Sequence, residues 1–318
     1  MPISERSIHR DKLSTIILAA GIGKRMYSKT PKILHTILGK PIISFVIDLA
    51  KAIQSDEIIV VVGKHGREIK KIIGSSVKYA LQTVPQGTGD AAKRGIALSS
   101  NRNVLILCGD VPFLTKKSIM KLMAHHAKEH SDITILTCEV KNPFGYGRII
   151  RDTRNRITGI IEQTDATRRQ QAIKEINTGV YYGKRTVIAS ALNEITSLNR
   201  QGEYYLTDIV RDLIKRRKKV ARVKIKNEEE ILGINSKLDL SYARELSKKR
   251  WFAELTARGV SIEDPVTTTI DLSVQIGTNV HIRPFTLIEG KTKIKDGGVI
   301  GPFAWIKNGK KMKSKPRM

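Results

Sequence analysis

Residues 18–32 read Leu-Ala-Ala-Gly-Ile-Gly-Lys-Arg-Met-Tyr-Ser-Lys-Thr-Pro-Lys, and this stretch decides the fold. Before it, Ser14-Thr-Ile-Ile-Leu18 is a short β-branched apolar run that predicts a buried parallel strand. Gly21 and Gly23 therefore lie where the strand becomes a loop, so that backbone N–H groups can approach a phosphate. The stretch predicts a cradle for a triphosphate, and a turn that needs glycine only for its backbone is the alternative. The cations that accompany the glycines are Lys24, Arg25 and Lys32.

The spacing of the loop excludes two common phosphate-binding motifs. A Walker loop requires Gly-x-x-x-x-Gly-Lys-Ser/Thr, and the chain does not supply it, because Gly39-Lys40 is followed by Pro41. A dinucleotide fingerprint requires a third glycine where this chain has Met26. A phosphate site at this loop would therefore belong to another class, and a turn that needs glycine only for its backbone stays the alternative.

The motif Leu-x-x-Gly-x-Gly-x-Arg-Met, followed by Pro31-Lys32, resembles the signature of the sugar-phosphate nucleotidyltransferases. With residues 33–41 it is similar to the uridyltransferase half of a bacterial bifunctional family, the UDP-N-acetylglucosamine pyrophosphorylase/glucosamine-1-phosphate N-acetyltransferases. The resemblance runs from about Ser14 to Gly301. It implies an α/β fold: a Rossmann-like nucleotidyltransferase domain with a mostly parallel sheet, a helical linker and a short left-handed β-helix.

The composition suits a soluble α/β protein of two domains. The chain has 318 residues, and 5% of them are aromatic. Cys108 and Cys138 are too few for a disulfide framework or a cysteine zinc site. Residues 1–12 lack the apolar region of a signal peptide, and no apolar run approaches the ~18 residues of a membrane span. We expect a cytoplasmic protein.

The net charge of +27 leaves two interpretations open. A nucleic-acid binder would produce it, and nonspecific affinity for polyanions is expected, first at residues 215–219 and 307–317. However, the cations are scattered through every segment without a nucleic-acid-binding motif. We therefore favour biased residue usage and expect neither a specific nucleic-acid partner nor a membrane partner.

After the loop, apolar strands alternate with helices, which predicts a parallel sheet with helices on both faces. Ligands of such sheets bind at the carboxyl ends of the strands. The expected helices cover residues 41–54, 67–73 and 89–98, and the expected strands cover 57–63, 77–81 and 104–108.

Two segments at strand ends resemble the nucleotide and metal sites of the family. In residues 82–91, Gln82 would pair with uracil and Gly87 and Thr88 would line the pocket, although a capped loop is the alternative. In residues 107–112, Asp110 is the expected Mg²⁺ ligand, although an N-cap or a turn residue is the alternative. Cys108 replaces the tyrosine that the family leads us to expect.

Residues 142–149, 159–167 and 175–180 resemble the sugar pocket of the family. A carboxylate and an amide suit the hydroxyl and acetamido groups of a sugar, because an unpaired buried polar group disfavours the wrong substrate. A hairpin glycine and a solvated strand glutamate are the alternatives. The residues at the binding positions are Gly147, Glu162 and Asn177.

Later segments complete the expected architecture. Residues 201–210 are expected to start an amphipathic helix, and residues 230–235 to end a strand at Asn235, by resemblance the second metal ligand. Residues 238–258 predict one long helix stopped by Gly259. Isoleucines then recur every six residues, which is typical of a β-helix of about two coils. They are Ile270, Ile276, Ile282, Ile288, Ile294, Ile300 and Ile306.

The resemblance implies uridylyl transfer from UTP to N-acetylglucosamine 1-phosphate, for cell-wall precursor synthesis, by a Mg²⁺-dependent homotrimer. Residues 1–237 would be the uridyltransferase, 238–258 the linker and 259–318 the β-helix with a basic tail. Arg25 and Lys32 would be catalytic, and Asp110 and Asn235 would hold the metal. The expected substrate-binding residues are Leu18, Ala19, Ala20, Gly21, Lys32, Gln82, Gly87, Thr88, Cys108, Gly109, Asp110, Gly147, Glu162, Asn177 and Asn235.

Three other functional expectations accompany this one. Transfer to another sugar or from another nucleotide is an alternative, and so is an inactive basic scaffold that binds polyanions. The acetyltransferase activity of the family is expected to be absent, because the chain leaves the β-helix pattern after Ala304, with Trp305 already departing from it. The only histidine of the β-helical segment is His281, on an early coil where nothing indicates a base.

Overall fold

The computed structural model describes residues 11–312, which form two compact units. Unit 1 holds the described residues up to Ile33 together with Ile43–Gly233. Unit 2 holds Leu34–Ile42 and the described residues from Ile234 onward. None of the helices within residues 11–312 is long and apolar enough to cross a membrane.

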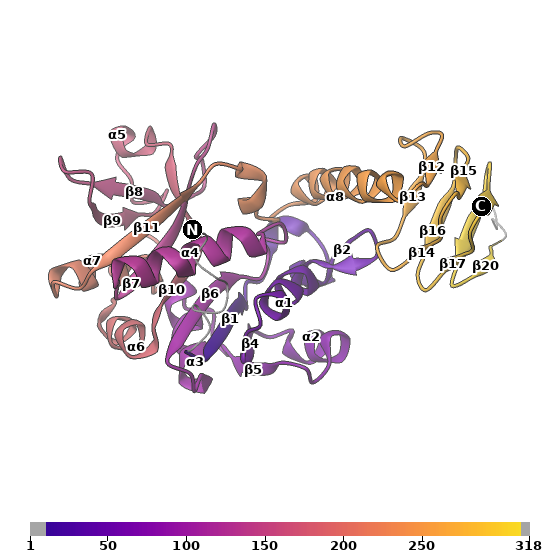
Figure 1. Ribbon diagram of the computed structural model, residues 1–318. Coiled ribbons are helices and arrows are strands. Elements are labelled where there is room, and N and C mark those ends of the chain that lie inside the picture. The colour runs from indigo at the N-terminus through magenta and orange to yellow at the C-terminus, as the bar shows by residue number, and fades with distance from the viewer. Residues whose placement is uncertain (1–10, 313–318) are drawn as a thin grey trace. The chain divides into compact units, whose positions relative to one another are not determined.

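Unit 1 is built on a nine-stranded sheet (Figure 1). The strand order is β11-β7-β10-β6-β1-β4-β5, and β8 joins β10 to β9. Pairing is parallel except along β10 and between β8 and β9. The strands are β1 (Leu13–Ala19), β4 (Glu57–Val62), β5 (Lys78–Leu81), β6 (Asn103–Cys108), β7 (Ile133–Glu139), β8 (Arg148–Arg151), β9 (Ile157–Ile161), β10 (Glu175–Lys184) and β11 (Val220–Ile225).

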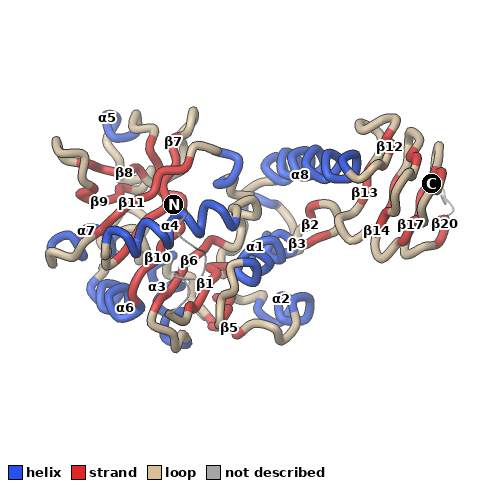
Figure 2. Tube along the Cα trace, in the orientation of Figure 1, coloured by secondary structure: helices blue, strands red, loops and turns tan. Residues whose placement is uncertain are grey.

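Both faces of this sheet are covered, as the apolar strands predict. Successive strand residues point to opposite faces, and Ile16 and Ile17 are both fully buried. Ile16 belongs to a core cluster with residues of α3, α6 and α7, and α4 packs on β7, β10 and β11. Helices therefore flank the strands in Figure 2.

The four helices expected at residues 41–54, 67–73, 89–98 and 238–258 are present, and their ends agree to within two residues. The helices are α1 (Ile42–Ala52), α2 (Gly66–Ile73), α3 (Thr88–Leu98), α4 (Lys116–Glu129), α5 (Arg168–Gln171), α6 (Arg185–Glu194), α7 (Asp208–Lys215) and α8 (Lys237–Ala257). Short 3₁₀ turns are η2 (Lys24–Met26), η3 (Lys32–Leu34) and η4 (Glu228–Ile231).

Two sequence predictions on local structure are wrong. The helix expected from Gln201 begins at Asp208, because the backbone before it bonds elsewhere: Tyr204 N donates to Gln86 O at 2.8 Å. The strand expected to end at Asn235 ends at Ile225. The Asn227 side chain accepts from Glu229 N and caps a 3₁₀ turn in its place.

Unit 2 begins with β2 (Thr36–Ile37) and β3 (Lys40–Pro41), an antiparallel hairpin, and continues with helix α8. A capping box between Ser236 and Asp239 starts α8, and Gly259, at φ 84°, follows its last turn. The hairpin belongs to this unit because its turn is hydrogen-bonded to the β-helical segment. Leu272 N donates to Leu38 O at 3.0 Å.

The six-residue isoleucine repeat is a β-helix. Its strands form three parallel ladders, β12-β15-β18, β13-β16-β19 and β14-β17, in which Thr269 pairs with Leu287 and Leu287 with Trp305. Ile270, Ile282 and Ile288 are fully buried and pack with α8. The strands are β12 (Ser261–Ile262), β13 (Thr269–Ile270), β14 (Gln275–Ile276), β15 (His281–Ile282), β16 (Leu287–Glu289), β17 (Lys293–Ile294), β18 (Val299–Ile300), β19 (Trp305–Lys307) and β20 (Lys310–Lys311).

Trp305 was expected to depart from this pattern, and that expectation is wrong. Trp305 pairs in register with Leu287, and Ile306 pairs with Ile288. The parallel pattern stops one step later, where β19 turns back antiparallel onto β20. The basic tail predicted for residues 307–318 lies outside the described residues beyond Met312.

We expect His126 in α4 to make the protein less stable as the pH is lowered. Its ring is buried against Tyr182 and its Nδ1 lies 2.9 Å from Thr134 Oγ1. Burial, reinforced by Lys184, lowers the pKa of His126 to about 4. Unfolded histidine titrates near pH 6.5, so below that pH the unfolded chain binds more protons, and stability falls toward pH 4.

The measurement is urea unfolding of the wild type and His126→Gln at pH 7 and pH 4.5. The unfolding free energy of each protein should be lower at pH 4.5 than at pH 7. This decrease should be about 2 kcal/mol smaller in the variant than in the wild type. Comparing each protein with itself removes the constant effect of the substitution. Equal losses in the two proteins would show that His126 does not carry the pH dependence.

Candidate active site

A cavity of about 560 Å³ in unit 1 lies at the carboxyl ends of β1 and β6. Parallel register brings these ends to one edge, because Leu18 pairs with Cys108 and Ala19 with Val62. We call this cavity the loop cavity. The predicted residues that line it are Leu18, Ala19, Ala20, Gly21, Lys32, Gln82, Gly87, Thr88, Cys108 and Asp110.

The central contact of the loop cavity is an ion pair between Lys32 and Asp110. Lys32 Nζ lies 2.5 Å from Asp110 Oδ2, and the two side chains are 11% and 22% exposed. The residues are 78 positions apart, and the sequence predicted each of them but not their contact. The pair places one cation and one carboxylate at the same point of the cavity wall.

Two glycines give this pair its space. A Cβ on Gly23 would lie 2.7 Å from Lys32 Cβ, so the lysine stem crosses the loop where a side chain is missing. Gly109 does not line the cavity, but its N–H donates to Leu18 O at 2.8 Å and ties the end of β6 to β1. The sequence predicted Gly23 as part of the loop but not that it makes room for the lysine stem.

Gln82 is buried and its amide nitrogen is already bonded. Nε2 donates to Gly87 O at 3.0 Å and to Asp90 Oδ2 at 2.9 Å. These bonds fix the orientation of the amide, so that Oε1 is the atom that can accept from a ligand. Gly87, just before α3, and Asp90, in its first turn, thus hold the Gln82 side chain in one orientation.

Thr88 and Gly87 hold a distant segment. Thr88 Oγ1 accepts from Leu206 N at 3.0 Å, and a Cβ on Gly87 would lie 2.6 Å from Tyr204 O. This docking brings Glu203 into the wall of the loop cavity. Sequence reasoning missed Glu203, because its place depends on a contact between segments more than a hundred residues apart.

Cys108 lies in the cavity wall but is not a nucleophile. Burial and the neighbouring Asp110 carboxylate raise the pKa of the Cys108 thiol to about 12, so the thiolate is absent at neutral pH. Its Sγ faces Gly179, which adopts φ 78° in the bulge of β10 and on which a Cβ would lie 2.6 Å from the sulfur. The missing side chain of Gly179 therefore leaves the space that the sulfur occupies.

The three expected sugar residues lie near one another, outside the loop cavity. Asn177 N donates to Gly147 O at 2.8 Å, and a Cβ on Gly147 would lie 3.4 Å from the Glu162 carboxylate. Glu162 Oε1 accepts from Thr207 Oγ1 at 2.9 Å. Burial raises the pKa of Glu162, because a buried carboxylate loses the solvation of its charge.

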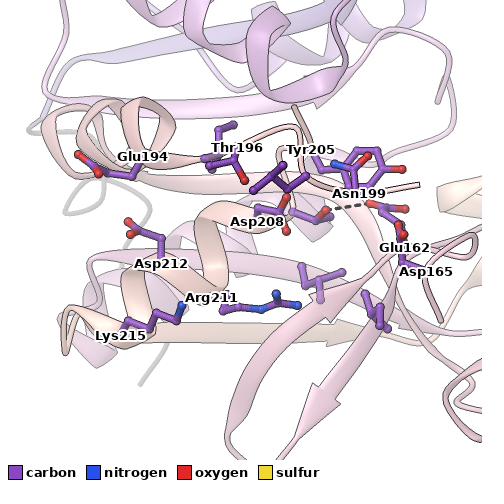
Figure 3. A pocket seen from close by; sticks show the side chains of 15 residues that line it. Glu162, Asp165, Glu194, Thr196, Asn199, Tyr205, Asp208, Arg211, Asp212 and Lys215 are labelled. Atoms are coloured by element: carbon purple, nitrogen blue, oxygen red, sulfur yellow. Dashed lines mark hydrogen bonds between the residues drawn. The ribbon is translucent and has the colours of Figure 1, made fainter. Parts of the chain in front are cut away.

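Glu162 also lines a second cavity of about 470 Å³, shown in Figure 3. Carboxylates from the turn after β9, from α6 and from α7 line it, in contrast to the basic chain as a whole. Burial also raises the pKa of Asp208. Arg211 and Lys215 are the cations of this cavity. This acidic wall is unsuited to a phosphate. The carboxylates are Glu162, Asp165, Glu194, Asp208 and Asp212.

Two expected residues are not part of the loop cavity. Arg25 is exposed in η2, beside Lys24, which does line the cavity. Asn235 belongs to unit 2, where its N–H donates to Asp239 Oδ2 at 3.0 Å at the start of α8. Their roles remain predictions.

The donor set limits the metal that the loop cavity can hold. Within residues 11–312, no group of three or more histidine, cysteine, aspartate or glutamate side chains is placed to bind a metal. Asp110 supplies a single carboxylate at the cavity. This fits Mg²⁺, which takes one or two carboxylates together with phosphate and water oxygens, and it does not fit a protein-only zinc site.

A glycine loop after β1, together with Lys32 and with Asp110 just beyond the neighbouring strand β6, is the arrangement expected of an α/β protein that binds nucleoside phosphates. Consistent with this class, the chain belongs to the nucleotidyl transferase family, whose model matches residues 14–251. The fold is also that of a UDP-glucose pyrophosphorylase structure, with a TM-score of 0.66 at 18% identity. The match covers 76% of this chain and 99% of that one.

Among curated proteins, the chain is similar to those named bifunctional protein GlmU. It is 43% identical over 298 residues to that of Caldanaerobacter subterraneus subsp. tengcongensis, covering 93% of this chain and 65% of the relative. It is also 43% identical over 291 residues to that of Thermoanaerobacter pseudethanolicus, covering 91% and 64%. The chain thus spans slightly less than two thirds of the length of these relatives.

Proposed function

We propose that the chain transfers uridylyl from UTP to N-acetylglucosamine 1-phosphate, releasing pyrophosphate and forming UDP-N-acetylglucosamine. The observation that carries this proposal is the loop cavity, in which ten predicted residues meet around the Lys32–Asp110 pair. Membership of the nucleotidyl transferase family and the similarity to the bifunctional proteins support it. Residues 1–237 would carry the activity, with 238–258 as linker and 259–318 as β-helix and tail.

The proposed chemistry is an in-line attack of the sugar phosphate on the α-phosphorus of UTP. The attacking phosphate oxygen is ionised at neutral pH, so the protein needs no general base. Lys32, helped by Arg25, would neutralise the charge that develops on the leaving pyrophosphate. Asp110 and Asn235 would hold Mg²⁺, which supplies charge neutralisation at the phosphates when bound.

The two ends of the substrate meet different surroundings. Gln82 Oε1 would accept from the uracil edge, while Leu18 to Gly21 and Gly87 line the nucleotide side. At the sugar end, Gly147, Glu162 and Asn177 would bond the hydroxyl and acetamido groups. The charges support this division, because Lys24 and Lys32 balance Asp110 and Glu203 in the loop cavity, whereas carboxylates outnumber cations in the cavity beside Glu162.

The test is pyrophosphate release by the purified chain with UTP, Mg²⁺ and N-acetylglucosamine 1-phosphate. We expect turnover that falls at least about tenfold with glucosamine 1-phosphate or with dTTP, because one unpaired buried polar group costs that much or more. A preference for another pair would favour a different sugar nucleotide. No turnover with any pair of substrates would favour the alternative that the chain is an inactive scaffold that binds polyanions.

We also propose that the chain forms a homotrimer, because the short β-helix buries little surface by itself. Sedimentation velocity at micromolar concentration should therefore give a trimer. A clean monomer would contradict this proposal. We propose the cytoplasm as the location of the chain. The absence of acetyl transfer stays a prediction, and the described β-helix histidine, His281, is engaged at 2.6 Å with Glu263.

A further inference from the structure

The Asp110 carboxylate has one bonding partner among residues 11–312, and that partner is the Lys32 ammonium. At 2.5 Å the ammonium occupies the position from which a cation bonds Oδ2. A divalent cation on the same carboxylate would therefore meet a positive charge already in place. Two like charges so close on one oxygen repel each other strongly.

Lys32 needs another anionic partner before it can leave this position. Its stem passes over Gly23, whose missing Cβ leaves the space that Lys32 Cβ and Cγ occupy. Its side chain is only 11% exposed, and the ammonium needs an anionic partner wherever it goes. The cavity offers one other carboxylate, Glu203, and it also contains Lys24.

We propose that Lys32 and the divalent metal compete for Asp110, and that the nucleotide ends the competition by giving the ammonium a phosphate partner. This inference rests on the proposed function and adds a binding order to it. The triphosphate draws Lys32 to its own oxygens, and Asp110 becomes available for the metal. The nucleotide-free protein should thus bind the metal weakly. The metal would then occupy Asp110 only after the nucleotide has bound.

The test measures binding of Mn²⁺ alone to the nucleotide-free protein, from the EPR signal of the unbound ion. Wild type should bind weakly, and Lys32→Met should bind at least about tenfold more tightly, a difference of about 1.4 kcal/mol. Lys24→Met is the matched control, since it removes one charge from the same cavity without touching Asp110. Lys32→Met combined with Asp110→Asn should lose the gain.

These outcomes separate the inference from the proposed function. Equal Mn²⁺ affinity in wild type and Lys32→Met, with binding still abolished by Asp110→Asn, would overturn the competition but keep the metal site. An equal gain in Lys24→Met would also overturn it, because the effect would then be general repulsion. Binding that does not depend on Asp110 in any background would overturn the metal site of the proposed function itself. Turnover is not needed for any of these readings.

Discussion

Asp110→Asn is expected to lower kcat about 10²–10³-fold, the largest effect of any single substitution that we predict. The asparagine keeps the size of the side chain and one carbonyl oxygen, but it loses the charge that holds a divalent cation beside the phosphates. It also removes the partner of Lys32. Pyrophosphate release at saturating UTP, titrated with Mg²⁺, measures the effect.

The fold should survive this substitution, because Asp110 is 22% exposed and lies just beyond β6, outside the core. Asp132→Asn is a matched control. It removes a carboxylate that pairs with Lys184 at 3.4 Å, but it lies before β7, at the amino end of that strand, far in the fold from the loop cavity. Near-normal, Mg²⁺-dependent turnover in Asp110→Asn would exclude Asp110 as a metal ligand.

The second large effect is expected for Lys32→Ala. Charge builds on the leaving pyrophosphate as the bond breaks, so an ammonium at that point acts mainly in the transition state. We expect kcat to fall about 10²-fold, with a smaller rise in KM for the sugar phosphate. Initial rates with both substrates varied give the two constants separately.

Lys32→Arg refines this prediction, because it keeps the charge but changes the length and shape of the side chain. The guanidinium is broader and longer than the ammonium, so it should not reach the same point beside Asp110, and recovery should be partial. Lys184→Ala serves as the control for loss of a lysine paired with aspartate elsewhere. A change in KM alone in Lys32→Ala would show that Lys32 only helps binding.

Local patterns carried most of the fold prediction. The alternation of apolar strands and helices is visible in the chain because a strand buried on both faces, such as β4, must be apolar at every position. The isoleucine repeat is visible for the same reason, since each coil buries one position per short strand. These patterns also predicted where loops leave the sheet, and hence which residues meet at its edge.

The errors occurred where backbone groups bond to distant segments. The stretch before Asp208 has helical spacing, but Tyr204 bonds to the loop before α3, and that bond replaces the helix. Trp305 looked foreign to the repeat, yet it pairs with Leu287, because on the ladder its backbone register matters more than its side chain. Neither competition is visible within a short window of sequence.

The sequence by itself determined the class of fold, the glycine loop after β1, the β-helix and, through the family resemblance, ten of the seventeen residues that line the loop cavity. Spacing and residue type impose these features locally. Only the tertiary structure decided that Lys32 pairs with Asp110, that Glu203 enters the wall, and that Gly23 must lack a side chain. The physical reason is that a charged side chain takes the best partner within reach, and folding alone determines which groups are within reach.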